Sequence, residues 1–142
     1  MATASSLLRY KGRLIYSVTP DAPVLDAIKE MAEHSVGALL VMQGEKLLGM
    51  VSERDYARKV ILKGRSSSET KVSQIMSSPV LTVPPGQSVN ECMRIMTDNR
   101  VRHLPVVDGE RVVGVLSIGD LVRAVVEEQQ QTIEQLEHYI HS

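Results

Sequence analysis

The apolar positions of this chain follow one pattern that occurs twice, 65 positions apart. Residues 18–56 align with residues 83–121 without a gap, and 12 of these 39 positions are identical. In each copy, a short extended piece that ends at proline precedes a stretch with helical spacing of apolar residues. These stretches contain Val24, Ala27, Ile28 and Met31 in the first copy, and Val89, Cys92, Met93 and Met96 in the second, where Ser88 is the predicted N-cap. The pattern indicates an internal duplication.

Two apolar runs separated by a glycine follow each predicted helix. They lie at 38–42 and 47–51 around Gly44, and at 104–107 and 112–116 around Gly109. Each pair of runs predicts a β-hairpin. A further helix is expected to begin at each Ser-x-x-Asp sequence. Ile15 and residues 80–81, just before the extended pieces, are predicted edge strands, so each copy is β-α-β-β-α.

The segment between the copies has no apolar period. Residues 64–70 are polar and rich in serine, which predicts a loop, and residues 72–76 are expected to form a short turn or helix. We therefore expect a first repeat at 10–63, a linker and connecting element at 64–76, a second repeat at 77–126 and a helical extension at 127–142. Because one repeat is too small for a comfortable core, we predict an α/β (α+β) fold in which the two sheets pack about a pseudo-two-fold axis, with clefts at their seam.

Composition narrows the classes of function. The 16 basic and 17 acidic residues nearly cancel, and there is no Phe or Trp, so nucleic acid is not an expected partner. No apolar run approaches the ~18 residues that span a bilayer, and no membrane association is expected. The single cysteine, Cys92, cannot form an intrachain disulfide and is expected to be buried. These features favour the cytoplasm.

The matched Ser and Asp residues are the candidates for chemistry. Ser52 and Asp55 in the first copy correspond to Ser117 and Asp120 in the second. A carboxylate at a helix start can accept both hydroxyls of a cis-diol, and a serine hydroxyl with nearby helix N-terminal amides can meet a phosphate or sugar oxygen. Ser and Asp can also recur simply as caps of the second helix. Spacing alone does not decide between these two interpretations.

The second copy carries a family resemblance. Residues 101–108 (VRHLPVVD), a glycine turn and residues 114–120 (GVLSIGD) resemble the signature of a cystathionine-β-synthase (CBS) domain, and residues 49–55 (GMVSERD) resemble its partner. The resemblance covers about residues 10–128 and is closest to stand-alone CBS-pair proteins of bacteria and plant organelles. It implies a non-enzymatic regulatory Bateman module. Such a module binds an adenosine-containing ligand (AMP, ADP, ATP, NAD or S-adenosylmethionine) and changes its interaction with a partner protein.

The resemblance also implies a set of ligand-binding residues. The aspartates would hold ribose, and Arg102 and His103, which have no counterpart in the first copy, would meet a phosphate; otherwise Arg102 is a solvated charge and His103 a hydrogen-bonded histidine. The expected ribose and phosphate residues are Asp120, Ser117, Gly119, Arg102, His103, Asp55, Ser52 and Arg54. The expected adenine wall is Tyr16, Val36, Gly37, Val80 and Val101. Because Leu40 and Gln43 replace Pro105 and Asp108, we expect the first site to differ from the second and to be weaker or empty.

Catalysis has little support in the sequence. The chain has no P-loop, no G-x-G-x-x-G, no G-x-S-x-G and no H-E-x-x-H sequence. His138 and His141 lack a nearby third metal ligand. We expect no enzymatic activity, no catalytic cofactor and no metal.

The C-terminal residues form a heptad stripe. Val122, Val126, Gln129, Ile133, Leu136 and Ile140 are spaced 4-3-4-3-4. Such an apolar stripe requires a partner surface, and we expect a homodimer. The alternative function is a constitutive interaction or scaffold protein with vestigial ligand clefts, in which this helix is the working surface.

Overall fold

The chain folds into two compact units. The computed structural model describes residues 2–12 and 14–141. Unit 1 contains the described residues of 1–13, 82–109 and 113–142, and unit 2 contains those of 14–81 and 110–112. The N-terminal segment therefore belongs to the unit that holds most of the second repeat.

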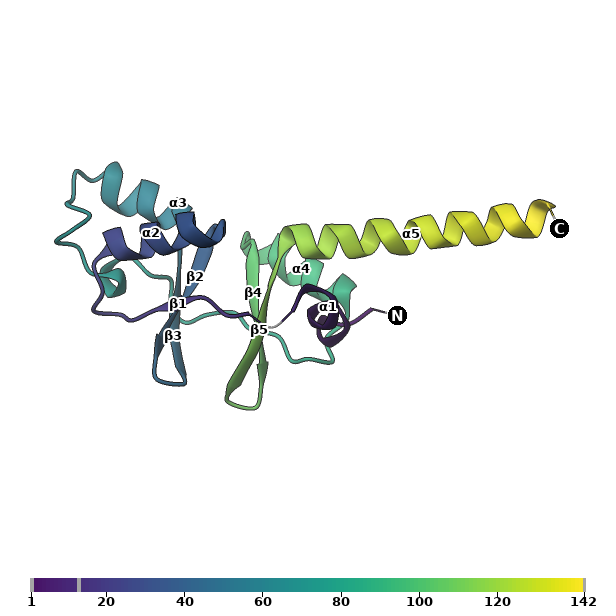
Figure 1. Cartoon of the computed structure of the whole chain (residues 1–142), viewed down its shortest axis with the longest axis horizontal. Helices are drawn as coiled ribbons and strands as arrows, with labels where there is room; N and C mark the ends of the chain where they lie inside the picture. The colour runs from purple at the N-terminus through teal and green to yellow at the C-terminus, as the bar shows by residue number, and fades with distance from the viewer. Residues whose placement is uncertain (1, 13, 142) are drawn as a thin grey trace. The chain divides into compact units, whose positions relative to one another are not determined.

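Unit 2 has the predicted β-α-β-β-α order (Figure 1). Its sheet has the order β1-β2-β3, with β1 parallel to β2 and β2 antiparallel to β3. The predicted hairpin around Gly44 is confirmed, as is the loop at 64–70. The elements are β1 (Ser17–Val18), α2 (Val24–His34), β2 (Ala38–Gln43), β3 (Lys46–Ser52), α3 (Glu53–Tyr56), the π-helical η1 (Ala57–Ile61) and the short 3-10 helix η2 (Val72–Gln74).

The core of unit 2 is built from the periodic positions of its helix and strands. The helix α2 buries Val24, Ala27 and Met31, the residues that its 3.6-residue period places on one face. These side chains pack with alternate residues of the hairpin, among them Leu39, Val41 and Val51.

Unit 1 repeats this plan around the second hairpin. The helix α4 starts at Ser88, whose side chain accepts a hydrogen bond from the Glu91 amide, so the predicted N-cap is confirmed. The helix α5 runs through residue 141, well past the remainder of its unit (Figure 1), and confirms the helical extension; Ser142 lies outside the described residues. The elements are α1 (Ala4–Lys11), α4 (Val89–Asn99), β4 (His103–Asp108), β5 (Arg111–Ser117) and α5 (Ile118–His141).

The predicted edge strands are misplaced. In the first repeat the strand lies at 17–18 instead of Ile15, and in the second, residues 80–81 form no strand. One parallel bridge remains there, between Val83 and Val106. The cause is the exchange of Leu40 for Pro105: Leu40 donates its amide to the Tyr16 carbonyl at 3.2 Å, whereas Pro105 has no amide hydrogen to offer the matched carbonyl of Leu81.

The helix α1 was not predicted from the sequence. It begins with a capping box in which the Thr3 and Ser6 side chains each bond the other residue's backbone amide. Ala4 and Leu8, one turn apart, are fully buried and belong to the core of unit 1. The N-terminal segment is thus an integral part of the folded unit.

The matched glycines of β3 and β5 make room for these connecting segments. A Cβ atom on Gly114 would lie 2.5 Å from Leu8 Cδ2. A Cβ atom on Gly49 would lie 2.7 Å from Met76 Sδ and 2.9 Å from the Ser77 carbonyl oxygen. Gly therefore recurs at this place because another segment crosses closely over each strand.

Two further predictions concern single features. Cys92 is fully buried, and burial, followed by the charge of Glu91, raises the pKa of its thiol, which fits a core residue. Among the described residues, no helix is both long and apolar enough to cross a membrane.

Candidate functional site

The Ser-x-x-Asp sequences form the same turn in both units. In the first repeat, the Ser52 hydroxyl accepts a hydrogen bond from the Asp55 amide at 3.1 Å. Asp55 Oδ2 accepts hydrogen bonds from the Ser52 amide and the Ser52 hydroxyl, both at 3.0 Å. Ser52 and Asp55 thus cap this helix, and one carboxylate oxygen is committed to the cap.

Ser117 and Asp120 repeat this geometry at the start of α5. Asp120 Oδ2 accepts from the Ser117 amide at 2.8 Å and from its hydroxyl at 2.9 Å, and the Asp120 amide donates to that hydroxyl at 3.2 Å. The other oxygen, Oδ1, lies 3.9 Å from Arg123 Nη1, which is too long for a hydrogen bond. Capping thus fixes the carboxylate and leaves Oδ1 as an acceptor.

The cations that approach the two aspartates differ. Lys59, one turn after Asp55, places its ammonium 3.2 Å from Asp55 Oδ1 and donates to the Ile75 carbonyl at 2.8 Å. The matched residue of the second repeat is Ala124. Asp120 instead receives Lys11, the last residue of α1, whose ammonium lies 2.7 Å from Oδ2 and 2.7 Å from the Val115 carbonyl oxygen.

These contacts set the protonation of Asp120. Burial raises the pKa of its carboxyl, but hydrogen bonds from Lys11 and Ser117, with the charge of Lys11, lower it by more. The net pKa lies below its ordinary value. Asp120 is therefore ionised at neutral pH, as an acceptor for ligand hydroxyls must be.

Arg102 and His103 lie beside the Ser117 turn. The Ile118 amide donates to the Arg102 carbonyl at 2.9 Å, just as the Glu53 amide donates to the Gly37 carbonyl at 3.0 Å in unit 2. Burial lowers the pKa of His103, the charge of Lys11 lowers it further, Asp120 opposes this, and Arg102 adds to the lowering. His103 is thus a neutral, half-buried imidazole in the electrostatic field of Asp120 and two cations.

This arrangement predicts a pH dependence of stability. Because folding holds the pKa of His103 below its ordinary value of about 6.5, the unfolded chain binds more protons just below that pH, and the free energy of unfolding falls as the pH decreases. We expect the denaturant concentration at the unfolding midpoint to be lower at about pH 5.5 than at about pH 7.5. This decrease should be smaller in His103→Gln. The same substitution at exposed His138 is the control, and equal slopes in wild type and His103→Gln would contradict the prediction.

The remaining predicted residues are divided between the units. Gly119 lies in the first turn of α5, and Arg54, its exposed counterpart, lies in α3. Of the predicted adenine wall, Tyr16, Val36, Gly37 and Val80 belong to unit 2, and Val101 belongs to unit 1. The Tyr16 ring already stacks on His34, with ring centroids 3.9 Å apart.

Sequence analysis missed both lysines that bind the aspartates. Lys59 was detectable, because a cation four residues after an acid on a helix is a recurrent pair. Lys11 was not, because it is 109 residues away from Asp120 in the chain.

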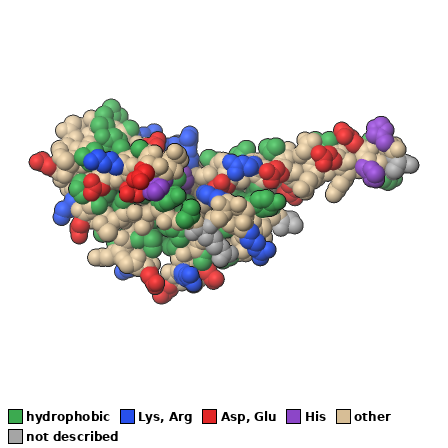
Figure 2. Space-filling view, viewed as in Figure 1, with side chains coloured by type: hydrophobic (Ala, Val, Ile, Leu, Met, Phe, Trp, Pro, Cys, Tyr) green, Lys and Arg blue, Asp and Glu red, His purple; other side chains and the backbone are tan. Residues whose placement is uncertain are grey.

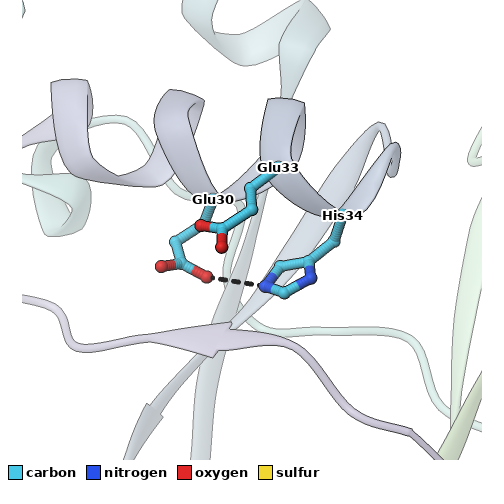
Figure 3. A group of neighbouring side chains, drawn as sticks. All are labelled: Glu30, Glu33 and His34. Atoms are coloured by element: carbon cyan, nitrogen blue, oxygen red, sulfur yellow. Dashed lines mark hydrogen bonds and ion pairs between the residues drawn. The ribbon is translucent and has the colours of Figure 1, made fainter.

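Glu30, Glu33 and His34 form a separate group on α2 (Figure 3). One ligand atom from each lies within 4.8 Å of the others, and His34 Nε2 lies 3.1 Å from Glu30 Oε2. Glu33 is exposed and the other two are half-buried. A hydrogen bond between residues four apart on one helix accounts for the observed contact.

A groove in unit 1 lies away from the Ser117 turn. It is lined by one residue of α4 and five of α5: Asn90, Val125, Glu128, Gln129, Thr132 and Ile133. Along this part of α5, hydrophobic side chains lie among acidic ones (Figure 2). The groove therefore includes two residues of the C-terminal stripe, Gln129 and Ile133, and neither of the two aspartates.

Comparison with known proteins identifies the repeats. The model of the CBS domain family matches residues 14–62 and 72–127. A mitochondrial CBS domain-containing protein of Arabidopsis thaliana, CBSX3, is 44% identical over 147 residues, which cover 97% of this chain and 71% of the relative.

Solved structures agree with this assignment. A Burkholderia ambifaria structure, described as a candidate signal-transduction protein with CBS domains, is 51% identical with a TM-score of 0.86, and the match covers 90% of this chain and 96% of that one. The CBS domain pair of protein MJ0100, in complex with 5′-methylthioadenosine and S-adenosyl-L-methionine, has a TM-score of 0.80 at 21% identity, with 90% and 98% covered. At that identity the likeness concerns the fold alone.

Proposed function

Because the chain belongs to the CBS domain family, we propose that it is a non-enzymatic regulatory module that binds an adenosine-containing ligand at its Ser-x-x-Asp turns and thereby changes its binding to a partner protein. The candidate ligands are AMP, ADP, ATP, NAD and S-adenosylmethionine.

The state of the Asp120 carboxylate is the observation that carries this proposal. Its side chain is 12% exposed and ionised, Oδ2 is held by Ser117 and Lys11, and Oδ1 is left without a hydrogen bond from Arg123. A half-buried acceptor held in place but not fully used suits a ribose hydroxyl, because a charge-assisted hydrogen bond contributes about 1.5–3 kcal/mol. Asp120 is therefore the proposed ribose ligand.

Asp55 is the weaker candidate. Its Oδ1 is already paired with Lys59, which is held in turn by the Ile75 carbonyl. A ligand must displace this ammonium before it can use Oδ1, the oxygen that at Asp120 has no hydrogen bond from Arg123, and the first repeat offers no counterpart of Arg102 or His103. We propose that the second repeat binds ligand more tightly than the first.

A thermal-shift panel of the five candidate ligands is the direct test. With a ligand at about 100 times its Kd, we expect the free energy of unfolding to rise by about 2.7 kcal/mol. Asp120→Asn, which keeps the size of the side chain and a capping oxygen, should abolish most of this rise because it removes the charge that strengthens the ribose contact. Asp55→Asn is the matched control and should retain it.

The result also separates the two candidate functions. If no ligand stabilises a folded, ligand-free preparation, the regulatory proposal fails. The scaffold alternative then gains weight, since both Ser-Asp pairs already serve as helix caps. An unchanged rise in Asp120→Asn would reject the assigned site and leave ligand binding in place.

We also propose that the module is a homodimer joined through α5. Val126, Ile133 and Ile140 occupy one heptad position and are all exposed, and the other position holds Val122, Gln129 and Leu136. β-Branched residues throughout the first position, with Leu136 at the second, favour a two-stranded coiled coil, so a second copy is the occupant that this stripe fits. As to compartment, the sequence favours the cytoplasm, whereas the Arabidopsis relative is named as mitochondrial.

A further inference from the structure

Lys11 contacts Asp120 from outside the second repeat. Its ammonium lies 2.7 Å from the carboxylate oxygen Oδ2, and it is contributed by the N-terminal helix α1. The first repeat has no such arrangement, because the cation of Asp55 comes from the helix of Asp55 itself. The duplication alone therefore does not explain why a lysine lies at this site.

The helix α1 holds Lys11 in position. Leu8, three residues earlier, is fully buried in the space that Gly114 leaves, and residues three apart share one face of a helix. The ammonium also donates to the Val115 carbonyl at 2.7 Å. Lys11 is thus held in position by a packed helix. Its side chain is 37% exposed, so it can also reach solvent or ligand.

The charges around Asp120 are predominantly positive. Lys11 and Arg102 both act on the neighbouring imidazole of His103, and Arg123 lies 3.9 Å from the other carboxylate oxygen. A ribose hydroxyl that approaches Asp120 enters a region with more cations than one carboxylate neutralises. A ligand with a phosphate would supply the missing negative charge, whereas the sulfonium of S-adenosylmethionine would be repelled.

Building on the proposed function, we propose that Lys11 makes the Asp120 site selective for adenosine ligands that carry a phosphate. Without ligand, the ammonium neutralises Asp120. When ribose hydroxyls take the carboxylate, the ammonium turns to the phosphate. An uncharged nucleoside offers no such anion, so a second ribose hydroxyl must compete with Lys11 for Oδ2 and gains nothing in return.

Calorimetric titration with AMP, adenosine and S-adenosylmethionine tests this proposal. We expect wild type to bind AMP at least about tenfold more tightly than adenosine, because one charge-assisted hydrogen bond is worth about that factor. Lys11→Met should weaken AMP binding by about tenfold, while adenosine binding stays unchanged or becomes tighter because its competitor is removed. Lys11→Arg should keep the preference for AMP, and Arg9→Met, which removes an exposed cation of the same helix, should behave as wild type.

The outcomes distinguish this inference from the function on which it rests. If Lys11→Met weakens AMP and adenosine by the same factor, or changes neither, Lys11 does not select for phosphate, although the ligand site stands. If no adenosine compound binds wild type, both proposals fail. A denaturation midpoint for Lys11→Met close to that of Lys11→Arg shows that differences in binding do not come from unfolding.

Discussion

Leu8→Ala is expected to lower the free energy of unfolding by about 2–5 kcal/mol, the usual cost of removing a fully buried leucine side chain. Leu8 lies in the N-terminal helix, before the repeats, but it belongs to the same core as α4, β4 and β5. Chemical denaturation of wild type and variant measures the change. Tyr10→Ala is the control on the same helix, because Tyr10 is 95% exposed and should cost less than about 0.5 kcal/mol.

A double-mutant cycle shows whether Leu8 acts through Gly114. Gly114→Ala places a Cβ atom 2.5 Å from Leu8 Cδ2, and we expect this overpacking to cost about 1–3 kcal/mol in wild type. In the Leu8→Ala background the same change should cost less, because the space is then free. Gly49→Ala, which contacts Met76 and Ser77, should instead add independently to Leu8→Ala. A cost below about 1 kcal/mol for Leu8→Ala would contradict the role of α1 in the core.

Two matched glycines in the sequence indicated that another segment, here α1, would pack closely on the second hairpin. Gly49 and Gly114 match in the duplication, and a glycine inside a strand often marks the close approach of another segment. The segment that crosses Gly49 precedes the second repeat, and the segment that crosses Gly114 precedes the first. The order of the segments along the chain therefore did not predict that the N-terminal residues pack on the second hairpin. The contact between Leu8 and Gly114 joins residues more than 100 positions apart.

Local patterns predicted the elements that depend on local interactions. The helices α2 and α4, both hairpins and the cap at Ser88 follow from residue spacing within each segment. The first strand of each repeat does not, because its partner is a distant strand. The Tyr16 carbonyl accepts a hydrogen bond from the Leu40 amide, and the second repeat lacks this bond because Pro105 replaces Leu40. The alignment of the two copies shows this replacement. Its effect on the strand follows only from the parallel register of β1 and β2.

The candidate site divides in the same way. The pairs Ser52 with Asp55 and Ser117 with Asp120 were predictable, because three residues separate the partners and both roles place them at a helix start. The charges that make the two turns different were not fully predictable. Lys59 follows from helical spacing, but Lys11 reaches Asp120 only through the packing of α1. The duplication therefore conserves the geometry of the carboxylate, and the surrounding cations give each copy its own properties.

The exposed stripe of α5 leads to the second large expected effect, on assembly. Val122, Val126, Ile133, Leu136 and Ile140 are each at least 45% exposed. On the opposite side of the heptad, Gln131 lies farthest from this stripe by helical spacing. A charge at Leu136 would thus be buried in a homodimer, whereas the same charge at Gln131 would stay in water.

We expect Leu136→Glu to weaken the homodimer by at least about 100-fold, because an unpaired charge in an apolar seam costs several kcal/mol. Sedimentation velocity over a range of protein concentrations measures the effect, with Gln131→Glu as the control that adds the same charge and should remain dimeric. Helix content by circular dichroism should stay close to wild type in both variants, since Glu is a good helix former. If Leu136→Glu sediments as wild type does, α5 does not join the subunits. If it becomes monomeric and still gains stability from nucleotide, ligand binding at Asp120 does not require the dimer, and α5 transmits the signal without forming the site.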